Sequence, residues 1–509
     1  MNRQFFFFSK NIVFQVLLFV MLELVNVILM QSSLNLVLSL CQVVIVLSYV
    51  LKKRIDKAFF LHVVFSLTCC DATSASVEYQ LLSYAEVKLF GPFTLSYIIL
   101  GIIWLYSRNM PIAAPKDSFI CRLRRIFIWM FLYGTIIGIG NLLLFSARLQ
   151  DFIIPFIYLL SGILSIDILV RLYEEEYLES CYNTAIALLI AAPFVTFITY
   201  FVLNIRASYS EFDALIFNEE FMMAPLMLLL LFYKGNRKGL VLLSLAVYFV
   251  CIFTAGRGGF FLNSFVALVF VVFIVFNRKD IGYVKLRKAF RIIIPILCAV
   301  GFSYIGLISV ESGVSLAGNK INEFLSMLSL FTSIGSGTGF ALSDMSESPY
   351  TRIAETANII YEGFSNPLAL IFGHGYGGTY TDCTGMFKNI DVSQGAFSYE
   401  VARSGVFGTA HSFLPSTILF NGLFGLFLII DIAFSYFKRI KYTPFVYAAY
   451  ILFLYSFYFN PSLLLAALFA LFVSEYKFNY VKESGYLNAG HEYSLKPDDN
   501  LSQRIKQNI

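Results

Sequence analysis

Two arginines and a histidine are the residues of this chain best suited to chemistry on an anion: Arg257, Arg352 and His411. Arg257 lies in the glycine-rich turn TAGRGG (254–259) between two apolar segments. Arg352 lies in the long polar stretch 311–410, and His411 follows it directly, where the chain becomes apolar again. Guanidinium groups bind phosphate oxygens through paired hydrogen bonds, and a neutral imidazole accepts a proton near neutral pH. If the three residues face one compartment, they predict chemistry on a membrane-bound anionic substrate.

The elements that must position these residues are membrane-spanning helices. Hydrophobic residues make up 58% of the 509 residues and charged residues only 14%, with a mean hydropathy of +0.75. A soluble domain cannot bury so much apolar surface, whereas runs of about 20 apolar residues cross the hydrocarbon layer of a bilayer. We therefore predict an all-α polytopic membrane protein with about fourteen spans. The spans lie near 12–30, 34–50, 58–77, 91–107, 126–146, 152–171, 183–203, 217–233, 239–255, 260–276, 292–310, 412–437, 443–459 and 461–476.

The placement of lysine and arginine sets the orientation of the predicted spans. With the N-terminus in the cytoplasm, most of the 37 basic residues fall in cytoplasmic segments. The chain then divides into eleven transmembrane helices over 1–310, a periplasmic loop with short helices over 311–410, three transmembrane helices over 411–477 and a polar cytoplasmic tail over 478–509. The net charge of +5 is on this basis a signal for insertion and does not indicate nucleic-acid binding.

Several common active-site signatures are absent from the sequence. It has no Walker A loop and no dinucleotide-binding fingerprint, so nucleotide-driven chemistry is not expected. The eight cysteines are scattered and lack the spacing of a disulfide framework or of a metal site. We expect no cofactor.

One helix within the polar stretch is predicted from its end signals. Ser348 suits the N-cap, Pro349 suits the first helical position, and Gly363 is a natural terminator. Apolar residues between these ends repeat at helical spacing and form one face: Ile353, Ala357, Ile360 and Phe364.

Arg352 falls in the first turn of this helix. A cation there opposes the helix dipole at a cost of about 0.3–1 kcal/mol, but free N–H groups and a guanidinium together bind a docked anion. The alternative is that Arg352 pairs with a neighbouring acid, Asp344, Glu347 or Glu355.

Two further groups of residues are candidates for the site. The segment 366–378 reads NPLALIFGHGYGG, and its glycines allow close approach of the backbone to a bound group. His374, Gly375, Gly377 and the loop cation Arg403 are therefore candidates for substrate binding, although a glycine-rich turn without a ligand is the alternative. His411, which opens the twelfth span, is the candidate base, and its alternative is a structural histidine at the membrane interface.

Four features in this order resemble the O-antigen ligase and polymerase superfamily of membrane glycosyltransferases. They are the turn around Arg257, Arg352 near the start of a loop helix, the 366–378 segment, and His411 followed by FNGLFG (420–425). The resemblance covers about residues 250–430 and implies an enzyme that uses glycans carried on undecaprenyl diphosphate at the outer face of the bacterial cytoplasmic membrane.

By that resemblance Arg257 and Arg352 would bind the diphosphate, and His411 would accept a proton from the acceptor hydroxyl. The arginines would supply the positive charge, so no catalytic metal is expected. The implied partners are the lipid-linked donor and acceptor oligosaccharides, with a chain-length regulator as a further candidate.

The resemblance leaves open which reaction is catalysed. Arg352 followed by ten residues and Gly363 matches the R-x10-G pattern of polymerase loops, and the predicted size and span number also favour a polymerase. A second such motif is missing, because Phe217 stands eleven positions after Arg206. A ligase, which moves the finished glycan to lipid A core, is the first alternative.

A flippase or transporter of lipid-linked repeats is the alternative from a different class. Such a protein would need ionisable residues inside the bundle, for which Glu23, Asp167 and Asp431 are the candidates. The conspicuous residues cluster instead at one face of the predicted membrane, which favours an enzyme.

Overall fold

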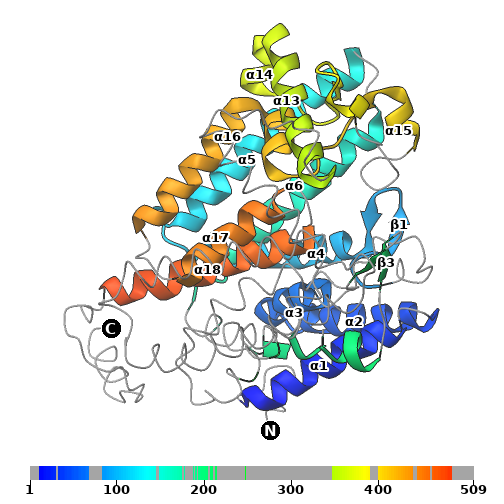
Figure 1. Ribbon diagram of the computed structural model, residues 1–509. Coiled ribbons are helices and arrows are strands. Elements are labelled where there is room, and N and C mark those ends of the chain that lie inside the picture. The colour runs from blue at the N-terminus through cyan, green and yellow to red at the C-terminus, as the bar shows by residue number, and fades with distance from the viewer. Residues whose placement is uncertain are drawn as a thin grey trace, which may run out of the picture.

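A computed structural model describes residues 11–29, 32–67, 83–144, 148–174, 347–389, 399–439, 444–458 and 461–483, with short pieces between 177 and 247. Arg257 lies outside these residues. The described part is mainly helical (Figure 1). Its helices are α1 (Ile12–Leu29), α2 (Leu34–Leu51), α3 (Ile55–Leu67), α4 (Leu95–Ser107), α5 (Phe119–Leu144), α6 (Leu149–Leu169), α13 (Glu347–Ser365), α14 (Pro367–Phe372), α15 (Tyr399–Ser404), α16 (Phe413–Arg439), α17 (Pro444–Ser456) and α18 (Pro461–Glu483).

Three small antiparallel two-stranded sheets accompany the helices of the described part. They pair β1 (Lys88–Phe90) with β2 (Phe93–Thr94), β3 (Ala207–Tyr209) with β4 (Phe212–Ala214), and β5 (Tyr380–Thr381) with β6 (Val406–Phe407). The first of these corrects the predicted span 91–107, because residues 91–94 belong to a hairpin and α4 begins at Leu95. Gly91 turns the chain there with a φ of 52°, a conformation that favours glycine.

Five helices of the described part are long and apolar enough to cross a membrane: α1, α2, α5, α6 and α16. Their outward side chains include exposed Met21, Val44, Leu143 and Phe434, which suit contact with lipid. These are the helices of an α-helical membrane protein, as the sequence predicts. The predicted spans 217–233, 260–276 and 292–310 lie outside the described residues, as does almost all of 239–255.

Helix α5 packs against α6 and α16, and α18 packs against α17, α6 and α5. The Glu475 carboxylate on α18 is buried and accepts hydrogen bonds from the backbone N–H groups of Phe119, at 2.5 Å, and Ile120, at 2.9 Å. These N–H groups belong to the first turn of α5 and have no partner within the helix, so a carboxylate at that position stabilises the helix start.

A buried aspartate on α6 links this helix to α4 and α5. Asp167 on α6 lies 2.6 Å from an Arg124 nitrogen and 3.5 Å from Nε of Arg171, and it accepts a hydrogen bond from Trp104 Nε1 at 2.8 Å. Asp431 on α16 instead forms a half-exposed pair with Arg122. Both aspartates, which are candidates for a transport path, bind arginines on the packed helices.

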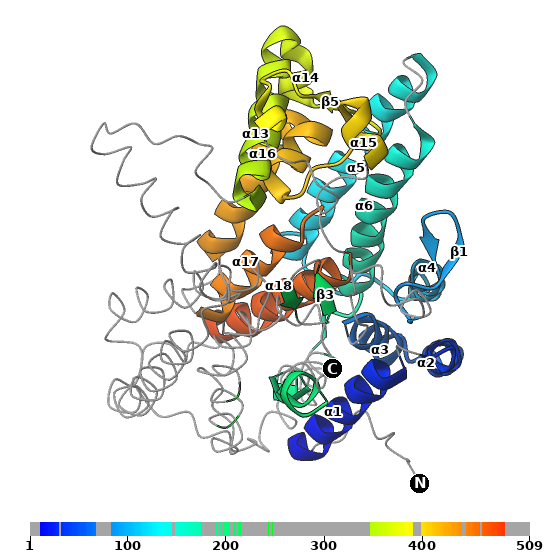
Figure 2. The same ribbon diagram turned by 45° about the vertical axis from the view of Figure 1, so that its right-hand side comes forward.

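Residues 347–389 and 399–412, which we call the cap, lie at one end of α5, α6 and α16 (Figures 1 and 2). The cap contains α13, α14, β5, α15 and β6, and it leads directly into α16. The predicted loop helix is present as α13, but it begins at Glu347 and continues past Gly363 to Ser365. Gly363 therefore does not end the helix. Its missing side chain leaves room for Leu370 of α14, whose Cβ would lie 2.8 Å from a Cβ at that position.

We expect Asp167→Ala to lower the stability of the protein by about 3–5 kcal/mol, because it leaves Arg124 and the buried Arg171 without their carboxylate. Asp431→Ala serves as the matched control and should cost about 1 kcal/mol or less, since its ion pair is partly exposed. Thermal unfolding of the detergent-solubilised variants measures both. Equal losses in the two variants would contradict the structural role of Asp167.

Candidate active site

A polar stripe on α13 faces the rest of the cap. Glu355, Asn358 and Glu362 are spaced three and four residues apart, which places them on one side of the helix. Glu355 and Asn358 are fully buried, and Glu362 is half-buried. Each of the three binds a different part of the cap. A polar stripe in a buried position requires such partners, since an unpaired buried polar group costs free energy.

Glu355 binds His411 through both carboxylate oxygens. Oε2 accepts a hydrogen bond from the His411 backbone N–H at 3.0 Å, and Oε1 lies 2.5 Å from the imidazole Nδ1. A carboxylate oxygen only accepts, so the Nδ1 that faces it carries a proton. The imidazole is 30% exposed, whereas the carboxylate is fully enclosed. The geometry is that of a histidine base oriented by an acid.

His411 stands two residues before the start of α16, as the sequence predicts. The Ser416 hydroxyl donates to the Ala410 carbonyl at 3.1 Å, which fixes the chain on the N-terminal side of the imidazole. His411 is therefore held from α13 and from the first turn of a membrane span.

Arg352 is half-buried and, as the sixth residue of α13, lies in its second turn and not in the first turn that the sequence predicts. It precedes Glu355 by three residues, so the two side chains are neighbours on the helix surface, with Cβ atoms about 5–6 Å apart. The structure thus brings Arg352 within one helical turn of the carboxylate that holds His411. Glu355, one of the acids considered as a partner for Arg352, binds His411.

Asn358 and Glu362 hold the remaining part of the cap. The Asn358 amide donates to Asp382 Oδ1 at 3.0 Å and accepts from the Thr384 N–H at 2.8 Å. Glu362 accepts from the Thr381 N–H at 3.0 Å. These contacts place β5, and β5 pairs with β6 a few residues before His411.

The glycine-rich turn is packed between α5 and α16. Gly373, Gly375 and Gly377 have φ angles of 78°, 69° and 81°, which favour glycine. The N–H groups of His374 and Gly375 donate to the carbonyls of Leu419, at 2.7 Å, and Phe420, at 3.1 Å. The N–H of Gly373 binds within α14, so the amides of these three residues already have protein partners. For Gly375 this arrangement favours packing over the predicted role in substrate binding.

Tyr376, in the same turn, fills the space between α5, α6 and α16. Its N–H donates to the Gly134 carbonyl at 3.0 Å, and its ring packs against Phe131, Phe152 and Phe420. Gly134 is required because a Cβ at that position would lie 2.8 Å from the Tyr376 ring.

The two other candidates lie on different parts of the cap. His374 is largely enclosed, and burial lowers the pKa of its imidazole while the Glu362 carboxylate raises it. Its carbonyl accepts a hydrogen bond from the Asn141 amide of α5. Arg403 lies exposed in the last turn of α15.

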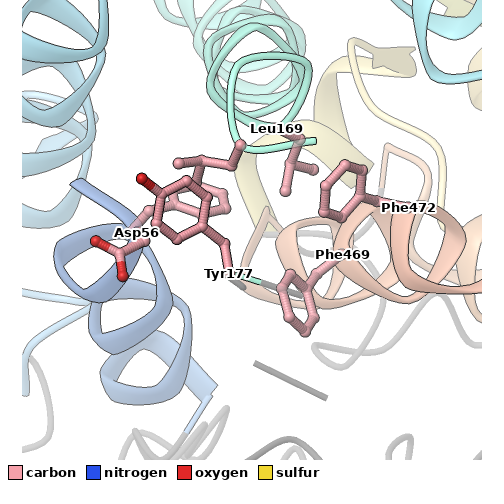
Figure 3. Close-up of a pocket in the computed structure, with 7 residues that line it drawn as sticks. Asp56, Leu169, Tyr177, Phe469 and Phe472 are labelled. Atoms are coloured by element: carbon pink, nitrogen blue, oxygen red, sulfur yellow. The ribbon is translucent and has the colours of Figure 1, made fainter. Parts of the chain in front are cut away.

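A small apolar pocket lies among α3, α6 and α18, away from the residues around His411 (Figure 3). Its lining includes Asp56, Leu169, Tyr177, Phe469 and Phe472, and its volume of about 10 Å³ holds one water molecule at most. It is too small for a sugar.

Within the part of the chain that the structure describes, no three His, Cys, Asp or Glu side chains gather as a metal site requires. No protein-family model, curated protein or solved structure matches this chain. The function is therefore argued from the site itself.

Sequence reasoning identified His411 and Arg352 but missed the roles of Glu355, Asn358 and Asp382. The spacing of Glu355, Asn358 and Glu362, three and four residues apart, is the signal in the sequence that indicates this polar stripe. The apolar face predicted for α13 needs correction. Ile353 and Phe364 of the apolar face are 37% and 70% exposed, and α13 packs instead through a mixed face, on which Glu355 and Asn358 are buried beside Ala354 and Ile359.

We expect Gly375→Ala to disrupt the packing of the cap, because a Cβ there would lie 2.6 Å from the Gly138 backbone nitrogen of α5. Gly405→Ala is the matched control, since Gly405 has a similar φ of 65° and nothing lies within 4 Å of its added Cβ. The control should cost only the strain of the left-handed conformation, about 1–2 kcal/mol. Thermal unfolding distinguishes them, and an equal loss in both variants would show that close contact with α5 is unimportant.

Proposed function

We propose that this protein is a membrane glycosyltransferase that polymerises O-antigen or a similar surface polysaccharide. It would transfer a growing glycan from undecaprenyl diphosphate to the non-reducing end of the next lipid-linked repeat unit. The reaction would take place at the periplasmic face of the bacterial inner membrane, without a metal. The observation that carries this proposal is the pair of the buried Glu355 carboxylate and the His411 imidazole, at the entrance of a membrane span and one helical turn from Arg352.

The reaction needs one proton acceptor and positive charge for one leaving group. His411 Nε2 takes the proton of the acceptor hydroxyl while its oxygen attacks the anomeric carbon of the donor sugar. The bond between that carbon and the diphosphate oxygen breaks, and undecaprenyl diphosphate leaves with the electron pair. Arg352, together with Arg257, would bind the diphosphate and stabilise the charge that develops on it.

Glu355 contributes in two ways. Its carboxylate fixes the tautomer in which Nε2 is unprotonated, and its negative charge stabilises the imidazolium that forms when the hydroxyl is deprotonated. The lipid-linked donor already carries a good leaving group, so the site needs no nucleotide. Both substrates are amphiphiles whose reactive groups lie at the membrane surface, which suits a base placed where a span begins.

The first test is His411→Ala at normal protein level in the producing cell, with the surface glycans separated by gel. We expect core lipid bearing a single repeat unit, because chains are not extended while ligation continues. His491→Ala, in the predicted cytoplasmic tail, is the control and should leave the ladder unchanged.

Three other outcomes would contradict the proposal. Core lipid without any repeat, with long chains accumulating on the carrier, would identify a ligase. Unextended repeats trapped on the inner leaflet would identify a flippase. An unchanged ladder would show that His411 is structural.

The role of Glu355 is tested by Glu355→Gln, which keeps the volume of the side chain and removes its charge. We expect chain extension to fall on the order of 100-fold or more, since the related acid-to-amide change in a serine protease triad acts through the histidine tautomer. Glu362→Gln is the matched control on the same stripe, because Glu362 binds the Thr381 backbone and not His411. Similar losses in the two variants would assign Glu355 a purely structural role.

A further inference from the structure

The cap exposes a row of apolar side chains that water does not favour. We call it the apolar ridge: Ile353, Tyr361 and Phe364 on α13, and Leu368, Ile371 and Phe372 on α14. These side chains are 37–70% exposed, and none of the α14 residues is buried. The buried face of α13 is mixed, with Glu355 and Asn358 beside Ala354 and Ile359, so the helix leaves large apolar side chains outside its packed face. A contiguous row of such side chains is the kind of exposed apolar patch that marks a contact surface.

The apolar ridge lies level with the end of α16 that is nearest the cap. The backbone of Gly373, just after α14, contacts α16 at Phe420 to Gly422, with an added Cβ 2.6 Å from the nitrogens of Asn421 and Gly422. Lys438 is a charged residue near the other end of α16. About 20 helical residues cross the hydrocarbon layer, so counting back from Lys438 places its opposite boundary close to residue 418. Helix α14 therefore lies beside this boundary.

The ridge also continues into the outward surface of α16. The ring of Phe372 packs against Phe424 with centroids 6.4 Å apart, and Phe424 is itself 41% exposed. Phe427, Ile430 and Phe434 extend the same exposed apolar surface along α16. An unbroken apolar surface thus runs from the membrane-spanning part of α16 onto the cap.

We propose that the apolar ridge is embedded in the lipid bilayer, with α14 and the adjoining end of α13 at the depth of the upper acyl chains in the leaflet nearest the cap. The partner is phospholipid itself. Amphipathic segments at such interfaces bury their apolar side about 5–10 Å into the boundary between headgroups and acyl chains. The irregular backbone of 373–376 is compatible with this depth because it is enclosed between α5 and α16 with bonded amides. This inference is independent of the proposed reaction.

Tryptophan fluorescence in vesicles tests the proposal. The chain has two tryptophans, Trp104 and Trp129, which are replaced by Phe before Phe364→Trp or Leu368→Trp is introduced in the full chain. The variants are reconstituted in phosphatidylcholine–phosphatidylglycerol vesicles whose acyl chains carry bromine near the headgroup end. We expect both ridge tryptophans to lose most of their fluorescence to the brominated lipid and little to aqueous iodide. Phe364→Trp replaces one exposed aromatic side chain by another, so this variant still tests the proposal if Leu368→Trp does not fold.

Two controls show the quenching expected of a tryptophan in lipid and of a tryptophan in water. The protein that keeps only Trp129, an exposed residue in the middle of α5, should be quenched by lipid. Thr381→Trp, at an exposed position on β5, should be quenched by iodide and not by lipid. Ridge tryptophans quenched by iodide alone would overturn the proposal by placing the ridge in water. Ridge tryptophans quenched by neither agent, while Trp129 responds to lipid, would overturn it by showing protein, either another segment or a second copy, over the ridge.

Discussion

A carboxylate enclosed in a membrane protein must have its oxygens satisfied, and in this chain His411 satisfies both oxygens of Glu355. This requirement constrains both the backbone around His411 and its imidazole ring. It ties the middle of α13 to the segment that leads into α16, and it orients the imidazole through Nδ1. If Glu355 were exposed, water would compete for its oxygens and His411 could rotate. Burial of the acid is thus the reason that the base has a defined orientation.

The glycine-rich turn supplies the second constraint, since it fixes the cap against the membrane helices. Its backbone binds carbonyls of α16 on one side and of α5 on the other, and only residues without a side chain fit so closely. At the same level the helical backbone of α16 is interrupted at Gly422, which has a φ of 65°. A side chain at this position would collide with the backbone of Ile371 and Gly373 at the end of α14. Asn421 is buried beside this interruption and accepts a hydrogen bond from Tyr458 at 2.6 Å. The NG pair in this part of the sequence therefore has a structural reason that requires no ligand.

The sequence predicted those features that depend on local pattern. The apolar length of residues 413–439 identified α16, the end signals near Ser348 identified α13 to within a few residues, and the step from polar to apolar located His411 at the start of α16. It did not predict which side of α13 packs, because the buried face combines polar and apolar residues, whereas periodicity analysis follows the apolar residues alone. It also did not predict the pairing of Glu355 with His411, because that contact joins residues 56 positions apart and depends on how the cap folds back.

The account is tested most directly by reconstituting the purified protein with two chemically defined, undecaprenyl-diphosphate-linked repeat units in the presence of a strong metal chelator. The account predicts lengthening of the glycan by whole repeats, with one undecaprenyl diphosphate released for each repeat added. Neither lengthening nor release of the carrier, from protein shown to be folded, would contradict it.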